Sequence, residues 1–248
     1  SIAEQISNET GVPKELIYKT PHFFFINQWH KINGTWYFYK SDGYDFHFIN
    51  ELLGEIISEY FELETVHYNI ARLCIKGKKE EYGLLSKNFC DKDYTYKRVW
   101  DYGFSQQGDL SILENIRTIC SSDDEYLVLL KDLKKFFIRD LYALLLDRNG
   151  NNFLFKINRE GIRLAPLYDY ELSFESMEPE YYRNQICTIN LRDKTTQEIL
   201  RQDSLFQELL NKIMSASIIK LIEILESRHK IIVEDELKEY YQKRENEV

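Results

Sequence analysis

The chain is poor in cysteine, and its four cysteines lie far apart without a CxxC pair. A secreted disulfide scaffold needs a higher cysteine density, and a structural zinc site needs closely spaced ligands, so both classes are excluded. The five histidines add no HxxxH or HxxE spacing, which also argues against zinc. We therefore expect reduced thiols that serve as ordinary side chains.

Long apolar runs are missing as well. No segment approaches the roughly 18 uncharged residues that a membrane span needs, and the first residues show no basic stretch followed by an apolar one. We expect no membrane partner and a cytoplasmic location. The sequence also lacks GxSxG, Walker A and GxGxxG motifs, which excludes the commonest hydrolase, P-loop and dinucleotide-binding sites.

Positive charge is in the minority. The chain has 32 Lys and Arg against 41 Asp and Glu, which gives a formal net charge of -9. Because clustered Lys and Arg supply most of the affinity for phosphate backbones, direct binding to nucleic acid is not expected. Any contact with DNA would need a basic partner protein.

What the chain does have is enough apolar material for a sizeable core, with 44% hydrophobic residues among 248. In its first part, residues 3–9 are weakly helical. Strands are predicted at 22–27 and 35–40, with a hairpin turn signal at Asn33-Gly34 between them.

An amphipathic helix is predicted at 46–60, with its acids on the surface that the apolar residues leave free. Helical spacing is shown by Phe48, Leu52, Glu55 or Ile56, and Tyr60. The alternation from Val66 to Leu73 and the segment 81–86 predict two further strands, joined by a basic turn. This order describes a small α+β lobe.

The second part of the chain is mostly helical. A long helix is predicted at 125–146, and the acidic run 121–125 is typical of a helix start. The segment 153–165 reads as a short hairpin, and helices follow from Asp203 to the end. We place the boundary between the two lobes so that residues 1–92 form the first and 93–248 the second.

The chemically informative stretch is DRNGNNFLFKINREGIRLAPLYDYE, which contains Asp147, Asn152 and Asp169. Phosphoryl transfer needs a carboxylate that orients the attacking hydroxyl and oxygen ligands that hold Mg²⁺ on the ATP phosphates. In this interpretation Asp147 is the base, and Asn152 and Asp169 are the metal ligands. Taken alone, Asp-Arg-Asn-Gly is more often a simple turn, and only its context favours the kinase interpretation.

The pattern DxxxxN, a strand, a short turn and then LAPLYD resembles the catalytic loop and metal-binding segment of the HipA-like kinases. The resemblance covers roughly residues 20 to 175. It implies a two-lobed protein-kinase-like α+β fold, with ATP and Mg²⁺ as cofactors. Arg148 also resembles the catalytic loop of phosphatidylinositol kinases, although Asn149 stands where a His is usual in both.

The resemblance further implies a strand lysine that holds phosphates and a helix glutamate that pairs with it. Lys40 and Glu51 match these positions, with Glu55 as an alternative to Glu51. The segment LLSKNF resembles the family's hinge, where the adenine edge would bond backbone groups near Lys87 and Phe89.

The first hypothesis is a serine/threonine protein kinase resembling HipA-like toxins, whose substrates include translation factors such as aminoacyl-tRNA synthetases. A small-molecule or lipid hydroxyl remains an alternative substrate. A second hypothesis is a nucleotide-binding pseudokinase or regulatory module, because the loop 28–34 has a single glycine and Asn149 departs from the family. A third is a DNA regulator bound to an antitoxin. A small antitoxin or regulatory protein is therefore a possible partner.

Overall fold

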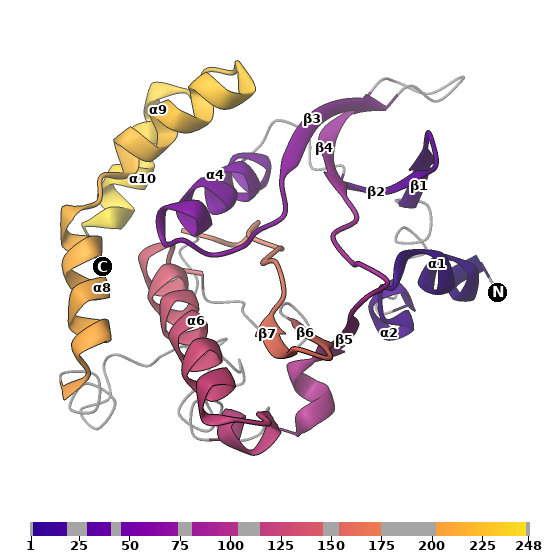
Figure 1. Cartoon of the computed structure of the whole chain (residues 1–248). Coiled ribbons are helices and arrows are strands. Elements are labelled where there is room, and N and C mark those ends of the chain that lie inside the picture. Colours follow the sequence, from indigo (N-terminus) through magenta and orange to yellow (C-terminus); the bar gives the residue numbers. More distant parts are fainter. Residues whose placement is uncertain are drawn as a thin grey trace.

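The central helix of the molecule, α4 (Phe46–Tyr60), packs between a β-sheet and a layer of C-terminal helices, as Figure 1 shows. The computed structural model that gives this arrangement describes residues 2–18, 29–40, 46–73, 81–103, 115–145, 154–174 and 202–246. The predicted strand 22–27 lies outside the described residues, as do Asp147 and Asn152.

The first sheet has the strand order β1-β2-β4-β3 and is antiparallel between neighbours. Its strands are β1 (Trp29–Ile32), β2 (Thr35–Lys40), β3 (Tyr68–Leu73) and β4 (Glu81–Lys87). The hairpin turn at Asn33-Gly34 is confirmed, and both residues have positive φ, as a two-residue hairpin turn requires. The strand that enters it is β1, however, so the prediction of a loop at 28–34 is wrong for residues 29–32. Two short helices, α1 (Ile2–Thr10) and α2 (Lys14–Tyr18), precede this sheet.

A second antiparallel sheet has the order β5-β6-β7. It consists of β5 (Thr95–Arg98), β6 (Leu154–Asn158) and β7 (Gly161–Leu164). The β6–β7 hairpin was predicted, whereas β5 was not. Only Tyr96 of β5 is buried, so the strand carries almost no apolar signal.

Helix α6 (Asp123–Tyr142) begins as predicted, because the Ser122 hydroxyl accepts a hydrogen bond from the Glu125 N–H. It ends earlier than the predicted residue 146. Leu144 adopts a left-handed φ of 47°, and the Leu145 N–H bonds the Asp140 carbonyl, which closes the helix. Glycine is the usual residue at such a position, and leucine stands there, so no local signal indicates this end.

The C-terminal layer contains α8 (Ser204–Ser215), α9 (Ile218–His229) and α10 (Asp235–Glu245). Figure 1 shows these helices stacked along the outer side of α4 and α6. Short 3₁₀ turns at Val99–Tyr102 and Ile116–Ile119 lie between β5 and α6. Within the described residues, no helix combines the length and the apolar character needed to cross a bilayer.

One apolar core joins α4, α6, the β6–β7 hairpin and the C-terminal helices. The prediction that the acids of α4 lie on its surface is wrong for Glu51 and Glu55, which are buried. Helix α4 is covered from several sides, and both carboxylates have cationic partners there. The fold is α+β, with a small β-rich lobe and a mostly helical lobe.

Candidate functional site

The site is centred on Lys40, the last residue of β2. Its ammonium nitrogen lies 2.5 Å from Glu51 Oε1 and 3.0 Å from Asp169 Oδ1, and it hydrogen-bonds both. It also forms an ion pair with Glu171 Oε2 at 2.6 Å. Three carboxylates from α4 and from the segment after β7 therefore converge on one ammonium group.

The electrostatics of Lys40 favour its charged form. Burial alone would lower the pKa of Lys40, but the carboxylates of Glu51, Asp169 and Glu171 outweigh burial and raise it well above its ordinary value. These carboxylates thus favour the charged form of Lys40, which is the form that can bind phosphates.

Glu51 is held rigidly. Its side chain has no exposed surface, and its Oε1 also accepts a hydrogen bond from the Tyr170 N–H at 3.1 Å. The carboxylate therefore links α4 both to the strand lysine and to the backbone just after Asp169.

The segment that carries Asp169 is fixed on both sides. Before Asp169, the Leu167 N–H bonds the Glu64 carbonyl and the Leu167 carbonyl accepts the Val66 N–H, both at 2.9 Å. After it, Asn50 Nδ2 donates to the Glu171 and Ser173 carbonyls. Asp169 itself has a φ of 65°, a left-handed conformation that is uncommon outside glycine and is often found at functional sites.

Tyr170 locks this segment against α4. Its ring is fully buried, and a Cβ added at Gly54 would lie only 2.2 Å from the Tyr170 Cγ, so glycine is required for this approach. The guanidinium carbon of Arg139 lies 4.2 Å from the ring centroid on a cation–π contact. The hydroxyl lies 2.6 Å from Thr65 Oγ1 and 3.1 Å from Ser58 Oγ.

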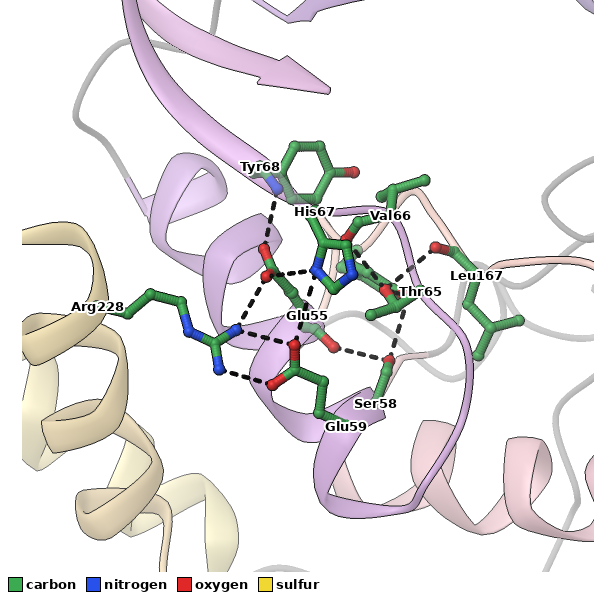
Figure 2. Close-up of polar contacts among 11 residues, drawn as sticks. Glu55, Ser58, Glu59, Thr65, Val66, His67, Tyr68, Leu167 and Arg228 are labelled. Carbon is green, nitrogen blue, oxygen red and sulfur yellow. Dashed lines mark hydrogen bonds and ion pairs between the residues drawn. The ribbon is translucent and has the colours of Figure 1, made fainter. Parts of the chain in front are cut away.

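One turn after Glu51, α4 is anchored again through Glu55, as Figure 2 shows. Glu55 Oε2 accepts the Tyr68 N–H at 3.0 Å, and Oε1 lies 2.9 Å from Arg228 of α9. Arg228 also makes two hydrogen bonds to the Glu59 carboxylate. The helix that carries Glu51 is thereby joined to β3 on one side and to α9 on the other.

Two groups of side chains in the described residues have a spacing that suits a cation. Oxygen atoms of Glu51, Asp169 and Glu171 lie within 4.8 Å of one another, and so do ligand atoms of Glu55, Glu59 and His67. In the second group Arg228 already forms ion pairs with both carboxylates. The first group offers carboxylate oxygens, the ligand type that Mg²⁺ prefers, and its Asp169 and Glu171 side chains are about a third exposed. Its donor chemistry therefore fits Mg²⁺.

The structure brings three of the sequence-predicted site residues together, namely Lys40, Glu51 and Asp169. Glu55, the alternative to Glu51, contacts Arg228 and His67 instead. Asp147 and Asn152 fall within residues 146–153, which connect the end of α6 to β6 and lie outside the described part.

Lys87 is the last residue of β4, and Phe89 follows two positions later. Leu84 is the register partner of Lys40, so Lys87 is about 10 Å further along the strand. Lys87 is exposed. The ring of Phe89 stacks on Tyr168, the neighbour of Asp169, with 5.9 Å between centroids. The segment predicted as the hinge and the segment of Asp169 are therefore in direct contact.

Sequence reasoning missed Glu171. The carboxylate two residues after Asp169 was visible in LYDYE, but the motif that drew attention to this stretch ends at the Asp. Burial raises the pKa of Glu171 above its ordinary value; Lys40 opposes this shift and Asp169 adds to it.

Comparison with known proteins identifies structures of similar fold but finds no relative with a similar sequence. No family model matches the chain, and no curated protein matches it either. Among solved structures, the proinflammatory kinase CtkA of Helicobacter pylori is similar, with a TM-score of 0.62 and 13% identity over 88% of each chain.

A second solved structure is similar over almost the whole sequence. It is HipA of Shewanella oneidensis MR-1, from a toxin–antitoxin complex with HipB and operator DNA. The TM-score is 0.57 and the identity 12%, with 98% of this chain and 68% of the other covered. These likenesses, together with the two-lobed arrangement around Lys40, show that the chain has a HipA-like kinase fold.

Proposed function

We propose that the chain is an Mg²⁺-dependent ATP:protein phosphotransferase that phosphorylates a serine or threonine hydroxyl. The observation that carries this proposal is the convergence of Lys40, Glu51 and Asp169 from β2, α4 and the segment after β7. A largely buried lysine held by a helix glutamate, beside an aspartate in a cation-compatible cluster, is the arrangement that phosphoryl transfer from ATP needs.

Each residue has a distinct role in the proposed mechanism. Lys40 would bind the α- and β-phosphates, and Glu51 would keep the ammonium in place. Asp147 would accept the proton of the attacking hydroxyl, and the adenine edge would meet the backbone near Lys87 and Phe89. Asp169 and Asn152 would hold Mg²⁺, which when bound neutralises charge on the phosphate oxygens.

The lobe boundaries proposed are residues 1–92 and 93–248. The similar HipA was solved with HipB and operator DNA, and this supports a small antitoxin or regulatory protein as a partner of the present chain. A translation factor such as an aminoacyl-tRNA synthetase is the proposed substrate class, with the cytoplasm as the location.

A second candidate is a nucleotide-binding pseudokinase. One observation favours it: β1 and β2 are joined by the two-residue turn Asn33-Gly34, with Ile32 paired to Thr35, so this hairpin has no glycine-rich loop to cover phosphates. Kinases commonly use such a loop for that purpose.

The test is transfer of labelled γ-phosphate from ATP and Mg²⁺ to proteins of a cell lysate. The intact protein is compared with Asp147→Asn and Asp169→Asn, and melting temperatures establish that the variants are folded. Labelling of a discrete band that both substitutions reduce by about 100-fold or more supports the kinase. Binding of MgATP without any labelling would support the pseudokinase instead.

A further inference from the structure

We infer that Glu171 is a specificity-determining residue of the phosphate subsite, which makes the site accept metal-bound ATP and reject metal-free ATP. Its carboxylate lies against Lys40, at the place where a phosphate oxygen has to arrive. This inference rests on the proposed function, because it concerns how the same lysine meets its nucleotide.

The first step of the argument is the crowding around Lys40. An ammonium group has three donors, and two of them are directed at Glu51 and Asp169. The Glu171 oxygen at 2.6 Å closes the remaining side. A phosphate oxygen can reach hydrogen-bonding distance only after one of these carboxylates moves.

Glu171 is the carboxylate best able to move. Glu51 has no exposed surface and is also bonded to the Tyr170 N–H, so it is fixed. Glu171 is about a third exposed, and among the described residues its side chain is held by Lys40 alone, whereas Asn50 holds its backbone carbonyl. Its side chain can therefore swing into solvent while the backbone stays in place.

The charge around Lys40 then determines whether metal-free ATP or MgATP can displace the Glu171 side chain. Three carboxylates around one ammonium leave an excess of negative charge, which repels a bare triphosphate. A divalent cation on the phosphates reverses the sign of this interaction, because it gives both Asp169 and the displaced Glu171 a positive charge to face. Glu171 thus adds to the barrier against free ATP and adds little against MgATP.

The experiment measures the affinity of the full chain for ATP by calorimetry, once with EDTA and once with Mg²⁺. Glu171→Gln removes the charge at nearly constant shape. The matched control is Glu160→Gln, which makes the same change on an exposed side chain in the β6–β7 turn. We expect Glu171→Gln to tighten binding of metal-free ATP about tenfold, with a change of less than about threefold for MgATP, while the control matches the wild type.

Other outcomes have separate meanings. An unchanged affinity for metal-free ATP overturns the inference and leaves the kinase proposal intact, and a selective loss of MgATP binding overturns it by making Glu171 a metal ligand. If the wild type binds no nucleotide under either condition, both proposals fail. Should Glu171→Gln not fold, Glu171→Ala replaces it, since it also removes the charge beside Lys40 and must shift metal-free binding in the same direction.

Discussion

At the scale of single residues, the ion pair between Lys40 and Glu51 contributes both to the candidate site and to the folding stability of the chain. Glu51 is completely buried, and its charge is balanced by the ammonium of Lys40. Burying an ionised carboxylate without a partner is costly, so the pair is sensitive to the loss of one member and much less so to the loss of both.

We predict that Lys40→Met lowers the free energy of unfolding by about 3 kcal/mol, because it leaves the Glu51 carboxylate uncompensated. The double variant Lys40→Met/Glu51→Gln is expected to recover most of this loss while remaining inactive. Urea denaturation of the wild type, both single variants and the double variant completes the cycle. A single variant as stable as the wild type would contradict the buried pair.

At the scale of secondary structure, α4 is the element on which the site depends. It contacts the Asp169 segment through Gly54 and Tyr170, and α9 through Glu55 and Arg228. Its two ends match the prediction from the sequence, because apolar residues recur at helical spacing along its whole length.

We predict that Gly54→Ala is destabilising by about 1–3 kcal/mol, although alanine is the better helix former. The new methyl group would overlap the Tyr170 ring, which Arg139 and two hydroxyl contacts hold in place. Chemical denaturation measures the change. Glu223→Ala, on the exposed face of α9, is the control and should stay within about 0.5 kcal/mol of the wild type. A stabilised Gly54→Ala variant would mean that the ring moves aside at little cost.

A further prediction concerns the contact between α4 and α9 in Figure 2. Arg228→Ala removes the cation beside the buried Glu55 and should cost about 1–3 kcal/mol, since Glu55 keeps only the Tyr68 N–H and the exposed His67 as partners. Thermal unfolding is compared with Lys220→Ala, an exposed change in the same helix. Equal losses of stability in Arg228→Ala and Lys220→Ala would show that the contact between Arg228 and Glu55 does not contribute specifically to stability.

The sequence predicted the helices and strands better than it predicted the contacts between them. Strands and helices with a clear apolar period were found, whereas β5 was missed because a single one of its side chains is buried. Asp169 was selected for the chemistry of its stretch, whereas Lys40 and Glu51 were selected through a resemblance, because no local pattern connects residues this far apart. Arg228 could not be paired with Glu55, which lies 173 positions earlier, before the fold was known.

At the scale of the whole molecule, the C-terminal helix α10 is connected to the candidate site through hydrogen bonds. The Tyr241 hydroxyl of α10 donates to Asn50 Oδ1 at 2.7 Å, and Asn50 Nδ2 donates to the Glu171 and Ser173 carbonyls. Tyr241 is fully buried. A hydrogen-bonded path thus runs from the last helix through α4 to the segment that carries Asp169.

We predict that Tyr241→Phe lowers the free energy of unfolding by about 1–2 kcal/mol, because Asn50 Oδ1 loses its buried donor. Amide hydrogen exchange should rise in residues 165–174, which Asn50 holds, and stay unchanged in the β1–β2 hairpin. Mass spectrometry of peptides from both regions measures the difference. A uniform rise in both would indicate general destabilisation in place of the proposed path.

The left-handed backbone of Asp169 has a consequence for how this position tolerates variation. A non-glycine residue in this conformation costs about 1 kcal/mol, and glycine avoids that cost. Folding and chemistry therefore favour different residues at the same place. In a library randomised at position 169, selection for solubility alone should enrich glycine and asparagine, whereas selection for phosphoryl transfer should return aspartate. The difference in stability between the residues enriched by the two selections would measure the stability that the aspartate costs for the proposed activity.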